Sequence, residues 1–130
     1  MRRLFALVVF LVLSACTSIP INQQTIRGRY EMLGKPEGGW YAGEALVLGD
    51  GTFQYWLFTP VPDDPRTGRY PVSGRYTLEG STITLHHPAV LVPQRSITRE
   101  GKQFLLWTDK QLAAYRDTHR QPDDLLLQRK

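Results

Sequence analysis

From residue 26 onward, apolar and polar residues alternate in a series of short runs. Tyrosine, phenylalanine, leucine and isoleucine occupy every second position, and arginine, threonine, serine and glutamate fill the positions between them. The main apolar positions are Ile26, Tyr30, Met32, Leu46, Leu48, Phe53, Tyr55, Leu57, Tyr70, Val72, Tyr76, Leu78, Ile83, Leu85, Phe104 and Leu106. A period of two with β-branched and aromatic residues is typical of strands that bury one face. We therefore expect an all-β domain with these side chains on its inner face.

The segments between the runs predict how the strands connect. Asp50-Gly51, Glu79-Gly80 and Glu100-Gly101 separate successive runs, and Asp50-Gly51 suits a tight primed turn in which both central residues have positive φ. Three hairpins in series describe an antiparallel up-and-down meander. Residues 34–40 and 59–67 are rich in glycine and proline and are expected to form longer loops, because proline does not fit a central strand.

The C-terminal part predicts one helix and one further strand. Thr108 and Gln111 have the spacing of a capping box, and we expect Tyr115 to be the helix residue that contacts the core. Residues 125–127 are three leucines, which we expect to form a last strand that closes against the first. About eight strands and one short C-terminal helix fit a small closed barrel, which has no exposed sheet edges.

The N-terminus has the layout of an export sequence. Arg2 and Arg3 precede an apolar run of ten residues, Leu4–Leu13, which is too short to span a bilayer. The junction Leu13-Ser14-Ala15-Cys16 follows directly and resembles the lipobox of bacterial lipoproteins. The resemblance implies that Cys16 receives a diacylglyceryl thioether, becomes the new N-terminus after cleavage and is then acylated. Several acyl chains make a stable membrane anchor.

This resemblance divides the chain into three parts. Residues 1–15 are expected to be a cleaved signal peptide, residues 16–24 a lipidated tether, and residues 25–130 a single barrel domain. In the enterobacterial pattern an aspartate after the lipidated cysteine retains the protein at the inner membrane, and this chain has Thr17 instead. We therefore expect an outer-membrane, periplasm-facing protein that is bound to the membrane through its N-terminal lipid.

A second resemblance concerns the barrel. The relevant stretch is Leu46-x-Leu48-x-Asp50-Gly51-Thr52-Phe53, followed by Gly74-x-Tyr76 and Ile83-x-Leu85. It is similar to the small lipocalin-like β-barrel lipoproteins of bacterial envelopes, over roughly residues 25–107. The shared motifs are turns and barrel glycines, so they imply a fold and not an activity. Two related groups carry a Cys-x-x-Cys pair or a disulfide, and this chain has one cysteine.

The candidate chemistry points away from catalysis. Removal of residues 1–15 leaves 14 basic and 12 acidic residues, scattered along the chain, so we interpret the charges as a solvated surface and expect no nucleic-acid partner. His86-His87 end a strand, and adjacent strand residues face opposite sides, which disfavours one shared metal ion. Asp63-Asp64 and Asp123-Asp124 follow prolines and fit exposed turns. We expect no cofactor, no metal site and no enzymatic activity.

The aromatic residues carry the remaining hypothesis. Tyr30, Phe53, Tyr55 and Tyr76 fall on inward positions and would line a ligand cavity, or else fill the core themselves. Trp56 and Phe58 face outward and would contact a partner or, more simply, the helix. The leading interpretation is a non-enzymatic module that binds a small apolar ligand or an envelope protein. The alternative is an inhibitor or sensor that docks on another envelope protein through loops 34–40 and 59–67.

Overall fold

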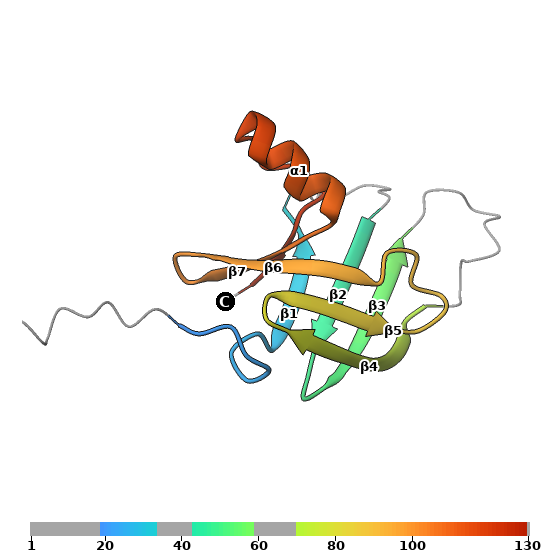
Figure 1. Cartoon of the computed structure of the whole chain (residues 1–130). Coiled ribbons are helices and arrows are strands. Elements are labelled where there is room, and N and C mark those ends of the chain that lie inside the picture. Colours follow the sequence, from blue (N-terminus) through green and yellow to red (C-terminus); the bar gives the residue numbers. More distant parts are fainter. Residues whose placement is uncertain (1–18, 34–42, 59–69, 130) are drawn as a thin grey trace, which may run out of the picture.

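The computed structural model describes residues 19–33, 43–58 and 70–129, which form eight strands and one helix (Figure 1). The strands are β1 (Gly28–Met32), β2 (Gly43–Leu48), β3 (Thr52–Phe58), β4 (Val72–Glu79), β5 (Thr82–His86), β6 (Gln94–Glu100), β7 (Gln103–Trp107) and β8 (Leu126–Gln128), and helix α1 (Asp109–Thr118) lies between β7 and β8. Cys16 and the loops 34–40 and 59–67 lie outside the described residues.

Each strand pairs antiparallel with the next one in the sequence, and β8 pairs back to β1, so the sheet closes into a barrel. The closing contact places Tyr30 opposite Gln128 and Met32 opposite Leu126. The prediction of an antiparallel meander whose last strand closes against the first is therefore confirmed, although β8 covers Leu126–Gln128, one residue later than the three leucines at 125–127.

This topology gives the barrel two different ends. One end carries the tight turns β2–β3, β4–β5 and β6–β7, the segment before β1 and the C-terminus; we call it the terminal end. At the other end β1 and β3 stop, the β5–β6 loop (residues 87–93) crosses, and β7 leads into α1; we call it the loop end. In Figure 1 the segment that precedes β1 lies on the same side as the β6–β7 hairpin and the C-terminus.

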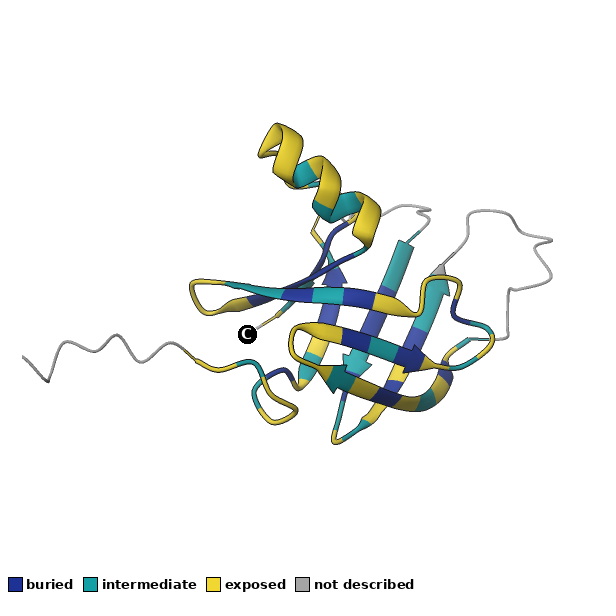
Figure 2. Cartoon of the chain, in the orientation of Figure 1, coloured by how far each residue is buried: buried dark blue, intermediate teal, exposed yellow. Residues whose placement is uncertain are grey.

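The barrel interior is the hydrophobic core. Buried and exposed residues alternate along β4 and β5, as expected for strands with one face inward (Figure 2). Gly74 lies opposite Phe53, and a Cβ at Gly74 would come within 2.9 Å of the Phe53 ring. The ring therefore covers the place where a side chain is missing, which lets β3 and β4 approach closely.

The β2–β3 turn differs from the prediction. Gly51 has a φ of 70°, but Asp50 does not have a positive φ, and the Gly49 amide donates to the Thr52 carbonyl at 2.8 Å. A turn closed from Gly49 to Thr52 needs left-handed backbone at only one residue. The prediction of positive φ at both central residues was wrong.

The segment before β1 is folded onto the barrel. The Asn22 side chain accepts from the amides of Gln24 and Thr25, both at 2.9 Å. Ile26 is fully buried, and Ile21 packs against the same core. Residues 21–24, which the sequence assigns to the tether, are therefore held against the terminal end.

Helix α1 begins with the predicted capping box, in which Thr108 and Gln111 bond each other's backbone amides. Its Leu112 and Tyr115 pack on a cluster outside the barrel wall that is formed by Leu105, Trp107, Leu125 and Leu127. The Tyr115 and Trp107 rings lie 4.9 Å apart, which places Tyr115 in the expected core contact. The helix does not plug the barrel.

The sequence had suggested that the helix covers Trp56. It does not, because the helix packs on the wall formed by β6 and β7. The Trp56 ring instead lies under the guanidinium of Arg29, whose Cζ is 5.4 Å from the ring centroid. The side chain of Phe58 lies outside the described part of the chain.

Candidate functional site

The four aromatic residues predicted to line the barrel all lie inside it. Tyr30, Phe53, Tyr55 and Tyr76 belong to one buried cluster together with aliphatic residues from all the other strands. Each phenol donates to a protein acceptor: Tyr30 to the Ile26 carbonyl at 2.7 Å and Tyr76 to the Gly49 carbonyl at 2.9 Å. Tyr55 donates to Glu44. These contacts favour a filled interior, one of the two alternatives that the sequence left open.

Burial also fixes the protonation of these phenols. It raises the pKa of Tyr30 well above the ordinary tyrosine value, with a smaller effect from Tyr76. Burial is likewise the main cause of the raised pKa of Tyr55, to which the neighbouring Glu44 carboxylate adds. The pKa of Tyr76 is raised by burial as well. The three hydroxyls are therefore neutral donors that hold parts of the barrel together.

A buried ion pair lies inside the loop end. The Arg95 Nη2 is 2.6 Å from the Glu44 Oε2, and the Tyr55 hydroxyl donates to the same oxygen at 2.8 Å. The Arg95 side chain is 3% exposed and that of Glu44 is 29% exposed. Both occupy inward positions at the starts of β6 and β2. The pair was not predicted, because the scattered basic residues were interpreted as solvated surface; for Arg95, which is buried, that interpretation was wrong.

The ion pair supports the β5–β6 loop. The Arg95 Nε donates to the Val92 carbonyl at 3.2 Å, and the Tyr70 hydroxyl donates to the Ala89 carbonyl at 3.2 Å. Val90 is buried in the core between these two points. Two carbonyls of the loop backbone thus accept hydrogen bonds from barrel side chains, and one apolar side chain of the loop is buried in the core.

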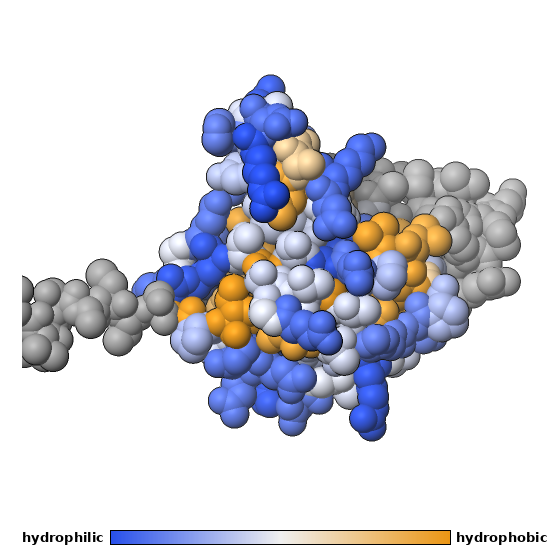
Figure 3. All heavy atoms as spheres, viewed as in Figure 1, coloured by the Kyte–Doolittle hydropathy of each residue, from blue (hydrophilic) through white to orange (hydrophobic). Residues whose placement is uncertain are grey.

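The side chains at the crest of this loop remain in solvent. Leu91 is 68% exposed and Val92 is 41% exposed, although both are large and apolar. Beside them runs a groove of about 510 Å³ between the loop and the first turn of α1. Its lining residues are Thr84, Leu91, Val92, Pro93, Gln94, Thr108, Asp109 and Lys110. Figure 3 shows hydrophobic surface over this loop, so the loop end presents a supported apolar crest next to a groove with charged side chains at its rim.

The polar motifs considered as candidate sites are accounted for by local contacts. The His86 Nε2 lies 3.1 Å from the Thr77 hydroxyl, and the His87 Nδ1 accepts from the Ala89 amide at 3.1 Å. Asp123 and Asp124 are exposed. Among the residues that the structure describes, no three histidine, cysteine, aspartate or glutamate side chains are grouped as metal ligands. Asp63 and Asp64 lie outside those residues.

A second charged cluster lies on the outer wall. Glu31 is buried although it faces outward, and its carboxylate oxygens are 2.6 Å from the Arg29 Nε and 2.6 Å from the Arg129 Nη2. Arg129 follows β8, so this cluster links the last strand to the first across the barrel closure. It has a structural role that period-two alternation does not reveal.

Comparisons with known proteins add no identification. No family model, curated protein or solved structure matches the chain. Over the described stretches, α1 included, no helix is long and apolar enough to cross a membrane.

Proposed function

We propose that this protein is a lipoprotein of the bacterial outer membrane, anchored through Cys16, whose barrel is a non-enzymatic module that docks on another envelope protein. The anchor is supported by the junction Leu13-Ser14-Ala15-Cys16, which directly follows an apolar run. The docking role is supported by the loop end, where Leu91 and Val92 are exposed on a loop that buried groups hold in place.

The main support for this proposal is that the barrel interior is packed, whereas the apolar side chains at the crest are exposed. Inside the barrel, the tyrosine hydroxyls bond to protein acceptors and the rings are packed. A small apolar ligand would have to displace these side chains. Leu91, in contrast, offers apolar area on a backbone that is already ordered, and pre-ordered contact residues lose little entropy on binding. Docking at the crest is therefore favoured over carriage in the barrel.

Two measurements test the two halves of the proposal. Intact-mass analysis of the natively produced protein should show cleavage before Cys16 and the added mass of a diacylglyceryl group and one further acyl chain. Both should be lost in Cys16→Ala. An unlipidated mature mass would refute the anchor.

Docking is tested with a photo-crosslinking amino acid placed at Leu91 in the full-length protein and expressed in cells. Ser73, which is exposed on the wall of β4, provides the matched control position. We expect one discrete adduct from position 91 that Val92→Asp abolishes, and none from position 73. Equal labelling from both positions, or no adduct from either, would overturn docking at the crest. A small molecule retained by the purified protein in native mass spectrometry would favour internal carriage instead.

A further inference from the structure

We propose that the terminal end of the barrel rests on the membrane surface, and that Ile19 and the tip of the β6–β7 hairpin contact phospholipid headgroups. The inference rests on the lipid anchor of the proposed function and adds an orientation to it. Its consequence is that the loop end, with Leu91, faces away from the membrane.

The chain between the lipid and the barrel is short. A tether that ran freely to residue 24 would let the barrel stand away from the bilayer and rotate. The structure shortens it: the Thr25 hydroxyl donates to the Pro20 carbonyl at 2.5 Å, and Ile21 packs on the core. Only Thr17 and Ser18 separate Cys16 from Ile19. Three residue steps span about 10 Å at full extension, so Ile19 stays close to the headgroups.

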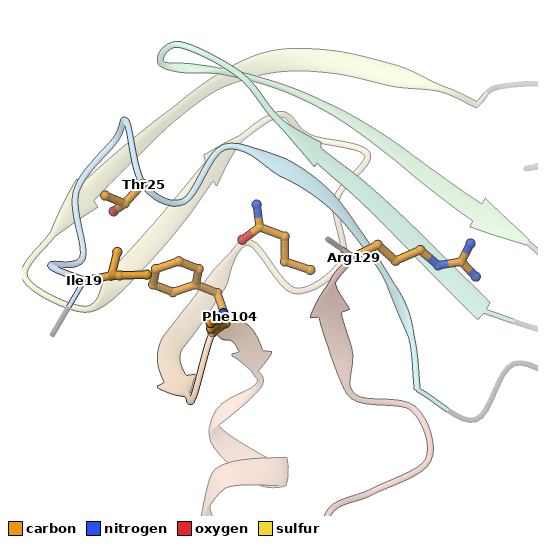
Figure 4. A pocket seen from close by; sticks show the side chains of 6 residues that line it. Ile19, Thr25, Phe104 and Arg129 are labelled. Carbon is orange, nitrogen blue, oxygen red and sulfur yellow. The ribbon is translucent and has the colours of Figure 1, made fainter.

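The surface beside Ile19 combines apolar and basic side chains. A groove of about 330 Å³ opens there, lined by Ile19, Thr25, Lys102, Phe104, Gln128 and Arg129. Figure 4 shows the Ile19 and Phe104 side chains beside each other, whereas the Arg129 side chain extends away from them. The Arg129 guanidinium is paired with Glu31 on the outer wall.

The remaining cation, Lys102, is exposed at the tip of the β6–β7 hairpin. Ile19, which lines the same groove, is 41% exposed. An apolar side chain beside a lysine ammonium suits the boundary between acyl chains and phosphates, where the ammonium meets phosphate and the apolar group enters the interface. Each contact is weak by itself, and the short tether is what makes them effective.

The orientation gives the two ends separate roles. Strand β4 has eight residues and spans about 25 Å along its own direction, and strands in a closed barrel tilt by about 40° from the axis, so the loop end stands roughly 20 Å above the terminal end. At that height the crest formed by Leu91 and Val92 is clear of the headgroups. It can meet a protein partner that projects into the periplasm.

The test compares two labelled positions in the natively lipidated full-length protein. Lys102→Cys and Leu91→Cys are each labelled with a thiol-reactive fluorophore, since lipidation consumes the only natural thiol. The proteins are reconstituted in phosphatidylethanolamine–phosphatidylglycerol vesicles that contain a headgroup-linked quencher. We expect several-fold stronger quenching at position 102 than at position 91. Equal quenching, or stronger quenching at 91, would overturn the orientation.

A linker variant tests the cause. An insertion of about 20 glycine and serine residues between Thr17 and Ser18 extends the tether by an r.m.s. of about 25 Å. We expect the difference between the two positions to collapse; a difference that persisted would refute the role of the short tether. Failure of the anchor is distinguishable, because an unlipidated protein shows an unmodified mass and does not remain with the vesicles at all.

Discussion

The buried ion pair between Arg95 and Glu44 predicts that loss of the glutamate charge destabilises the fold more than loss of the arginine. The two groups are not equally buried: Arg95 is 3% exposed and Glu44 is 29% exposed. When one partner of a buried pair is removed, the loss of stability depends on the solvent access and the hydrogen bonds that the other partner keeps. Removal of the carboxylate charge leaves a guanidinium out of water without a counter-charge, although it still donates to the Val92 carbonyl. Removal of the guanidinium leaves a carboxylate that reaches solvent and keeps the Tyr55 hydroxyl.

The magnitudes follow from this asymmetry. Glu44→Gln strands a buried cation, and we expect a loss of about 3 kcal/mol in the free energy of unfolding. Arg95→Met removes charged hydrogen bonds but leaves a partly solvated anion, and we expect a loss of about 1.5 kcal/mol. Near 4 °C per kcal/mol for a domain of this size, the melting temperature should fall by about 12 °C and about 6 °C, respectively. The double variant should lose about 2 kcal/mol, less than Glu44→Gln alone, because no buried charge remains without a counter-charge.

The assay is urea unfolding of the mature protein, followed by tryptophan fluorescence and by circular dichroism. Agreement between the two probes checks that unfolding is two-state. The reasoning would be refuted if Arg95→Met were more destabilising than Glu44→Gln, or if the effects of the single variants simply added in the double variant. Simple addition would mean that the two groups do not interact, despite the 2.6 Å distance between them.

Two further predictions concern the interior. Tyr30 and Tyr55 have raised pKa values, so above about pH 10 the unfolded chain loses protons that the folded chain keeps. Stability should therefore fall as pH rises above that point. The phenolate absorbance of Tyr30 and Tyr55 should appear only together with loss of the native circular dichroism. Phenolate from all six tyrosines in a folded protein would contradict this. Gly74→Ala places a methyl group 2.7 Å from a backbone carbonyl of β5 and should cost about 3 kcal/mol in chemical denaturation. The control Gly80→Ala has no atom within 4 Å of the added carbon and should lose only the backbone cost of its positive φ, about 1 kcal/mol, so equal losses would contradict the role of close packing.

The sequence predicted the architecture well because the relevant information is local. Period-two alternation identifies the inner face of each strand without knowledge of its neighbours, and Thr108 with Gln111 marks a helix start within four residues. The three leucines at residues 125–127 were sufficient to predict closure, since an unpaired first strand needs a partner.

The candidate site was not predictable in the same way. Glu44 and Arg95 meet across the barrel interior although they are 51 positions apart in the sequence. Alternation shows which face a residue occupies, but it does not show which strand lies opposite in a closed barrel. Arg95 lies two residues before Ile97, so the two side chains share the inward face of the strand. A charged residue at an inward position was the one available sign of a buried ion pair. The place of α1 outside the barrel also depends on tertiary packing, because Leu105 and Trp107 face outward on a strand that is apolar on both sides.

The buried pair is better explained by the position of the β5–β6 loop than by stability. An ion pair taken out of water gains little over well-packed apolar side chains of the same volume, because desolvation offsets most of the attraction. An apolar replacement would fill the space at the start of β6, but it would not donate to the Val92 carbonyl. Arg95 fills this space, and it also donates a hydrogen bond to the backbone of the loop that carries Leu91 and Val92. The double variant at positions 44 and 95 should therefore remain folded yet release the loop backbone at Val92, while Tyr70 and the buried Val90 still hold the rest of the loop. This links a charge buried in the barrel to the docking that we propose at its surface.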